Sequence, residues 1–255
     1  MFKRNFRTPS KPRYFNSGKQ FSQTPYKSRY RRNPTNVARK LSFDRVERPL
    51  RTNVLVERQH GSHMALLTNN DITSFVEFPA RGVNGDGRSK EYVKLLHLNV
   101  SGVLNVILSG GDQPMTANDK LNGLFVLTLI LDRKPFLPDG VNQLPTYAEL
   151  FGPYSSAYVN LQLLDTHKER FKILGSCKRY VRSGGGASYA PLKLAIKLSN
   201  QRYPLWAAFK DFDQMTSGGN YKNIAKNAIL VNYAFVAMDN FKVEPFVQFE
   251  LKYLG

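Results

Sequence analysis

The sequence predicts an all-β protein: an antiparallel sandwich, of which the eight-stranded jelly roll is the natural form, preceded by a disordered basic N-terminal arm. Short β-branched and aromatic runs recur from about Thr52 onward, separated by Gly, Pro, Asn and Asp. Apolar and polar residues alternate within several of these runs, and the first 51 residues show neither feature. A closed barrel fits the same number of strands, because strand count does not determine topology.

The predicted arm covers residues 1–51 and differs in charge from the β domain predicted for residues 52–255. It holds 15 Lys and Arg residues and two acidic ones, Asp44 and Glu47, and the first 40 residues have no acidic side chain. Prolines interrupt a segment rich in Ser, Asn and Thr that lacks apolar periodicity. Such a segment buries too little surface to offset the entropy of ordering it, so we expect it to be disordered without a partner.

Eight strands are predicted in the β domain, and a single short helix interrupts them. The strands are Thr52–Glu57, Ile72–Phe78, Tyr92–Leu108, Gly123–Asp132, Arg170–Arg182, Tyr189–Leu198, Ala228–Met238 and Pro245–Tyr253. The last is the clearest, because its apolar residues alternate with Gln248, Glu250 and Lys252. Thr146 and Glu149 have the spacing of a capping box at the start of a helix that Gly152 ends.

The net charge of +18 and the pI near 10 favour a polyanionic partner, either nucleic acid or an anionic membrane surface. A ribosomal or merely basic soluble protein has the same composition. The single cysteine, Cys177, excludes a disulfide framework and Cys-rich zinc modules, and it fits a reducing compartment. No apolar run approaches the ~18 residues of a membrane span.

The arm carries the strongest functional signal, because aromatic rings lie between its cations. Cations neutralise phosphates and aromatic rings stack on unpaired bases, so the pattern predicts nucleic-acid binding without sequence preference. A solvated charged tail is the simpler alternative. Six of the cations also have the spacing of a bipartite nuclear import signal: Lys27, Arg29, Arg31, Arg32, Arg39 and Lys40.

The β domain offers two weaker candidates. Arg170, Lys172, Lys178, Arg179 and Arg182 extend the basic track, although charges on a solvent-facing strand explain them equally well. A leucine-rich nuclear export signal is the second candidate, in one segment of alternating apolar residues: Leu192, Leu194, Ile196 and Leu198. The period of two is also that of any half-buried strand.

Catalysis is not predicted, and neither is a cofactor or a metal. The four histidines and Cys177 lack the spacing of metal ligands, although His60 and His63 are three residues apart. No phosphate-binding Gly-rich loop and no nucleophile elbow occurs. Asp211 and Asp213 could bind a cation, but a capping or turn role is the better interpretation.

Several motifs in one order resemble the nuclear shuttle proteins of begomoviruses, relatives of the geminivirus coat protein. The motifs are Asp132–Pro135, Tyr147–Gly152, Lys168–Lys172, Leu198–Tyr203, Phe209–Asp213, Asn223–Val231 and Phe249–Gly255. The resemblance spans residues 72–255, and the arm matches in character. It implies a viral capsid-like jelly roll and a protein that binds single- and double-stranded DNA without sequence preference.

The resemblance also implies a route and partners. Such a protein carries viral DNA between the host nucleus and cytoplasm and passes it to the viral movement protein, peripherally at the cytoplasmic side of the host plasma membrane. Importins, an exportin, receptor-like kinases and a nuclear acetyltransferase of the host are implied partners, with homo-oligomers forming on DNA. A second import segment would match residues 81–96, here with Arg81, Arg88, Lys90 and Lys94, and the export signal would fall within residues 177–198. The alternative function is a coat protein that packages single-stranded DNA.

Overall fold

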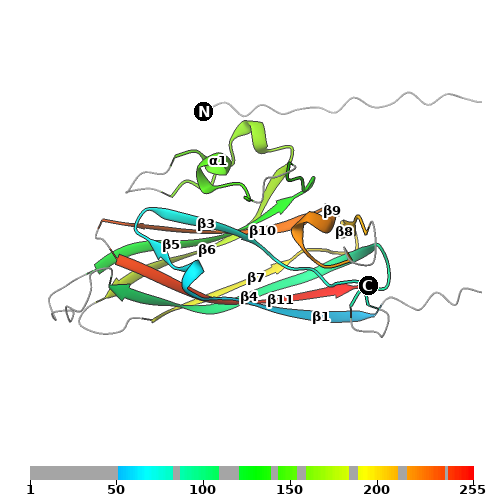
Figure 1. Cartoon of the computed structure of the whole chain (residues 1–255), viewed down its shortest axis with the longest axis horizontal. Helices are drawn as coiled ribbons and strands as arrows, with labels where there is room; N and C mark the ends of the chain where they lie inside the picture. The colour runs from blue at the N-terminus through cyan, green and yellow to red at the C-terminus, as the bar shows by residue number, and fades with distance from the viewer. Residues whose placement is uncertain are drawn as a thin grey trace, which may run out of the picture. The chain divides into compact units, whose positions relative to one another are not determined.

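Two antiparallel sheets face each other in the computed structural model, which describes residues 51–82, 87–108, 121–138, 143–153, 159–183, 189–211, 217–238 and 241–255 (Figure 1). The strands are β1 (Thr52–Gln59), β2 (Leu66–Leu67), β3 (Asn70–Phe75), β4 (Tyr92–Leu108), β5 (Leu121–Asp132), β6 (Phe171–Ser183), β7 (Tyr189–Lys197), β8 (Leu205–Phe209), β9 (Ile224–Lys226), β10 (Ala228–Ala237) and β11 (Phe241–Leu254). The helical elements are α1 (Tyr147–Phe151) and the 3-10 turns η1 (Ser62–Met64), η2 (Asp165–His167) and η4 (Tyr221–Asn223). Within these ranges, no helix has the length and apolar character needed to cross a membrane.

The eight long strands pair in a nested order that defines the topology. The first, β1, pairs with the last, β11, and β3 pairs with β10. Inside these pairs, β4 pairs with β7, and β5 pairs with its neighbour in sequence, β6. One sheet therefore has the strand order β1-β11-β4-β7, with β2, β8 and β9 at its margins, and the other has the order β3-β10-β5-β6. This is the eight-stranded jelly roll that the sequence predicts.

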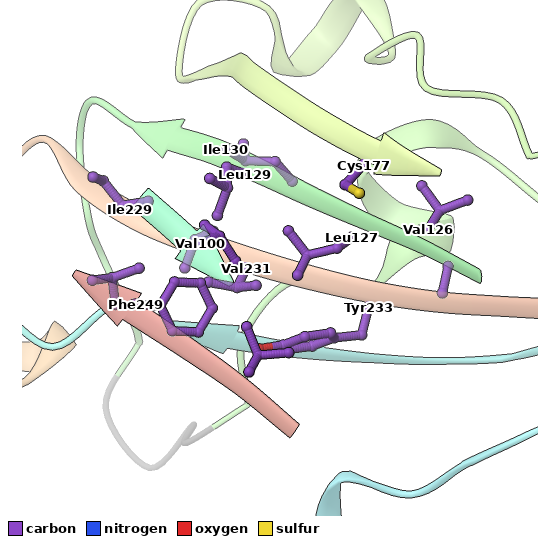
Figure 2. Packing of buried hydrophobic residues seen from close by; sticks show 14 of the residues in the cluster. Val100, Val126, Leu127, Leu129, Ile130, Cys177, Ile229, Val231, Tyr233 and Phe249 are labelled. Atoms are coloured by element: carbon purple, nitrogen blue, oxygen red, sulfur yellow. The ribbon is translucent and has the colours of Figure 1, made fainter. Parts of the chain in front are cut away.

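The core lies between the two sheets. Val231 and Tyr233 of β10 and Cys177 of β6 face Val100 of β4 and Phe249 of β11 (Figure 2). All five side chains are buried, and each large apolar side chain buried in this way stabilises the fold by about 1.5–3 kcal/mol. Cys177 therefore belongs to the packed interior.

The outer face of the sheet β3-β10-β5-β6 is also covered. Every residue of β10 is buried, so this strand is buried on both of its faces. The connection between β5 and β6 supplies the cover, with α1 lying over this sheet (Figure 1). Thr146 and Glu149 form the predicted capping box: the Thr146 hydroxyl accepts from the Glu149 N–H and the Glu149 carboxylate accepts from the Thr146 N–H. The Tyr147 N–H donates to Asp71 of β3 at 2.7 Å, which ties the helix to the sheet.

The predicted strands all form, with differences at their ends and three short additions. β3 ends at Phe75 instead of Phe78, because the Phe78 N–H leaves the sheet and donates to the Gly219 carbonyl. β11 begins at Phe241, four residues before the predicted start at Pro245. Neither β1 nor β2 pairs with Pro245. Such a position tolerates a residue without an N–H. β2, β8 and β9 were not predicted. The arm, apart from Arg51, lies outside the described residues, so its disorder and the domain boundary stay predictions.

Candidate nucleic-acid interface

β6 and β7 are edge strands that adjoin at one side of the sandwich. Among the described strands, β6 pairs only with β5 and β7 only with β4. The Arg179 Nε donates to the Pro191 carbonyl across the two sheets at 2.8 Å. A Cβ at Gly175 would lie 2.7 Å from Cδ1 of Ile196, so glycine permits β6 and β7 to approach this closely. The interior is therefore closed at this side, and the outer sides of both strands meet solvent.

The chain from Phe171 to Lys210, which includes both edge strands, contains eight Lys and Arg residues and no Asp or Glu. Arg179 is half-buried and the other seven are exposed: Lys172, Lys178, Arg182, Lys193, Lys197, Arg202 and Lys210. We call these seven residues the basic wall. Because this stretch contains no carboxylate, its cations have the charge that favours contact with phosphate groups.

Three tyrosines on the same stretch of chain expose most of their side chains. Tyr180 of β6 is 78% exposed, Tyr189 of β7 is 64% exposed, and Tyr203 after β7 is 69% exposed. Exposed aromatic rings between cations are the elements with which proteins stack unpaired bases while holding the phosphate chain. The basic wall and these tyrosines are therefore the candidate contacts for single-stranded nucleic acid, with Lys178 and Arg182 on the outer face of one sheet and Lys193 and Lys197 on the outer face of the other.

Arg170 is not part of this interface, which corrects the basic track expected from the sequence. Its guanidinium makes a two-bond ion pair with Asp132, with Nη2 2.8 Å from Oδ2 and Nε 3.0 Å from Oδ1. The Asp132 side chain is fully buried and also accepts from the Tyr221 hydroxyl. The bond to Asp132 raises the pKa of Arg170, and burial together with the Asp132 charge raises the pKa of Tyr221. The Arg170 charge is thus neutralised within the fold.

Arg88, expected in a second import segment, is completely buried. Its Nη1 donates to Asp211 at 2.6 Å, its Nη2 donates to the other Asp211 oxygen, and its guanidinium carbon lies 3.7 Å from the Phe209 ring centre. The Arg88 guanidinium also donates to the backbone carbonyls of Pro79, Lys90 and Ser217. The hydrogen bonds that Asp211 accepts from Arg88 and Asn223 hold the pKa of Asp211 below its ordinary value. In the folded domain, Arg88 is inaccessible to an import receptor.

The other three residues of that segment stay near the surface. Arg81 lies 3.8 Å from Asp211 with its side chain half exposed. The Lys90 ammonium lies 5.7 Å above the Tyr92 ring, and the Lys94 ammonium lies 5.9 Å above the Trp206 ring. The fold therefore buries Arg88 while Arg81, Lys90 and Lys94 stay partly exposed, and an import role for those three stays a prediction.

The candidate export residues lie on the inner side of β7. Leu192 is buried, and Leu194, Ile196 and Leu198 are half-buried against the core. Lys193 and Lys197 alternate with them and face outward. A receptor that reads the apolar side chains needs β7 to leave the sheet edge, and an edge strand bound on one side only is the kind of strand that can do so.

The six import residues of the arm lie outside the described residues, as does Asp213. Asp211 binds Arg88 and Asn223, so its role is that of a structural anchor. Within the described part of the chain, no group of three His, Cys, Asp or Glu side chains comes together to hold a metal ion.

The sequence prediction named three residues of the basic wall, Lys172, Lys178 and Arg182, and missed the four that follow them. Lys193, Lys197 and the exposed tyrosines are not among the functional residues that the sequence predicts. The signal that finds them is the absence of acidic residues over a length of sequence that includes two strands and the segment between them.

Comparison with known proteins identifies the family of this chain. Residues 3–255 match the model of the geminivirus coat protein/nuclear export factor BR1 family. The chain is 49% identical to a nuclear shuttle protein of African cassava mosaic virus (isolate West Kenyan 844) over 86% of each chain. It is 31% identical to a nuclear shuttle protein of squash leaf curl virus over 87% of this chain and 83% of that one. The protein therefore belongs to the geminivirus coat protein/nuclear export factor BR1 family.

Proposed function

We propose that this protein is a viral nuclear shuttle protein, which binds viral DNA and carries it between the host nucleus and cytoplasm. The observation that carries the proposal is the 49% identity to a nuclear shuttle protein over most of both chains. The basic wall supports it, because a carrier of nucleic acid needs an accessible cationic surface outside its folded core.

The DNA contact proposed here is independent of sequence. Lys and Arg side chains of the arm and of the basic wall bind phosphates, which are the same at every nucleotide. The described part of the chain presents no long helix that could enter a major groove to read base edges. Single strands gain additional stacking on exposed tyrosines, while duplexes bind through phosphates alone. Several copies assemble along one DNA chain.

Transport uses two opposed signals in this proposal. Lys27, Arg29, Arg31, Arg32, Arg39 and Lys40 bind importin in the cytoplasm and phosphates in the nucleus, since both partners present negative charge. Export uses Leu192, Leu194, Ile196 and Leu198, which an exportin reaches when β7 opens. In the cytoplasm the protein passes its DNA to the viral movement protein at the plasma membrane. Host receptor-like kinases and a nuclear acetyltransferase act on it along this route.

A titration of the full chain against unrelated single strands, duplexes and RNA at two salt concentrations tests the DNA-binding half. We expect similar affinities for unrelated sequences of one strand type and a steep loss of affinity at the higher salt concentration. A protein that ignored all oligonucleotides at low salt, or recognised one defined site, would refute the proposal.

A coat protein that packages single-stranded DNA is the second candidate, because the matched family includes coat proteins and the fold is a jelly roll. Electron microscopy of the protein mixed with circular single-stranded DNA separates the two. Closed particles favour the coat protein, whereas discrete oligomers along the strand favour the shuttle.

A further inference from the structure

A pocket of about 340 Å³ opens at one end of the sheet β3-β10-β5-β6, where the ends of β5, β6 and β10 meet. The strand register explains which side chains form it. Tyr180 of β6, Leu124 of β5 and Val236 of β10 are cross-strand partners and so share one face of the sheet. Arg182 and its partner Asn122 lie two residues further along the same face.

The pocket begins where the cover over this face ends. Two residues further from the strand ends, Val126 pairs with Lys178 on the same face. Val126 is fully buried beneath the connection that contains α1. At the pocket, Val236 still forms an apolar floor with 4% exposure, but Tyr180 and Met238 are 78% and 85% exposed. Two large side chains that could cover an apolar floor instead extend into solvent beside it.

The chemistry of this pocket matches a nucleobase with its phosphates. Tyr180 offers an aromatic face and Met238 a polarisable thioether, and both make favourable contacts with flat aromatic rings. Lys178 and Arg182 are exposed on the same side of β6, two residues before and after Tyr180, and hence about 7 Å away on either side.

We propose that this pocket receives one unpaired base of single-stranded DNA, stacked on Tyr180, while Lys178 and Arg182 bind the phosphates on either side of it. The inference rests on the proposed DNA-binding function and deepens it, because it gives a structural cause for a preference for single strands. A base in a duplex reaches the pocket only after leaving its stack, which costs a few kcal/mol.

The test compares Tyr180→Ala with Phe136→Ala in the full-length protein, using a thymidine oligonucleotide, an abasic chain of equal length and a duplex. Both aromatic side chains are highly exposed, but Phe136 neither lines the pocket nor belongs to the candidate interface. Because one base–aromatic stack contributes about 1–3 kcal/mol, we expect Tyr180→Ala to weaken thymidine binding about 5- to 150-fold. Binding of the abasic chain and of the duplex should stay unchanged, and Tyr180→Phe should retain the affinity of the unaltered protein.

A base analogue whose fluorescence is quenched by stacking provides a second readout, with the quenching lost in Tyr180→Ala and retained in Phe136→Ala. Equal losses for thymidine and abasic chains would overturn the pocket, because the effect would then be independent of bases. An unchanged affinity of Tyr180→Ala for thymidine would overturn it as well. If the unaltered protein bound none of the three probes, the proposed function itself would fail, an outcome distinct from these two.

Discussion

At the scale of single residues, Arg88 shows how a cation can be assigned the wrong environment from sequence. Arg88 lies among other basic residues and near glycines, which is typical of an exposed loop. Its partner Asp211 is 123 positions away and also anchors Asn223. No local pattern predicts a pairing at that separation, so the sequence predicted a surface charge where the fold has a buried one.

Removing the Asp211 charge should destabilise the domain strongly. Asp211→Asn leaves the buried Arg88 guanidinium without its counter-ion, and breaking one side of a buried pair costs about 3–5 kcal/mol. Urea denaturation of the variant and the unaltered protein measures this difference. Asp165→Asn is the matched control, because the Asp165–Lys168 pair is exposed and should leave the denaturation midpoint unchanged. An equal midpoint for Asp211→Asn would contradict an anchoring role.

The stability conferred by Asp211 should also depend on pH. Arg88 lowers the pKa of Asp211 below 3.8 in the folded protein, so the folded state favours the ionised carboxylate. The contribution is fully present above the unfolded pKa and is lost as the pH falls through the folded one. The difference in free energy of unfolding between the unaltered protein and Asp211→Asn should therefore shrink as the pH falls from about 5 through the lowered pKa of Asp211 in the folded protein. A constant difference would show that ionisation of Asp211 is not the cause.

At the scale of elements, the sequence predicts which side of a strand is buried better than it predicts which strands pair. Period-two alternation located β7 and β11, and the 17-residue β4 was predicted with its observed bounds. The same alternation contains no information on which strands pair, so the prediction of a jelly roll depended on the number of strands alone. β8 and β9 were missed because five and three residues are too short to show a period and because pairing with each other stabilises them.

The outer side of β7 provides a test of the basic wall. Lys193→Glu with Lys197→Glu reverses two exposed charges opposite the buried Leu192 side, so the fold should be retained. If both lysines contact phosphates, the slope of log affinity against log salt for a single strand should fall by about 1.4. Lys134→Glu with Lys226→Glu makes the same change in net charge at exposed sites outside the wall and should alter the slope much less. Equal effects of the two pairs would mean that only net charge matters.

At the scale of the whole molecule, charge and fold are divided between different parts of the chain. Residues 1–51 carry a net charge of +13 of the total +18, while the β domain carries the packed core and the basic wall. The composition predicts that the arm binds phosphates, and this stays a prediction. The wall could not be predicted as a surface, because it depends on β6 and β7 being edge strands at the same side of the two sheets.

Deleting residues 1–43 should separate these contributions. The deletion removes 12 cations and none of the basic wall, so single-strand binding should persist with a much shallower salt dependence. Nuclear accumulation should be lost, because all six predicted import residues are removed with the arm. Fluorescence microscopy of tagged chains and affinity measurements over a series of salt concentrations give the two results independently.

Replacing the six import cations with Gln in the full-length chain controls for the change in length: it should abolish accumulation as well. Retained nuclear accumulation in both variants would place the import signal in the β domain, where Arg81, Lys90 and Lys94 are the accessible cations of the second predicted segment.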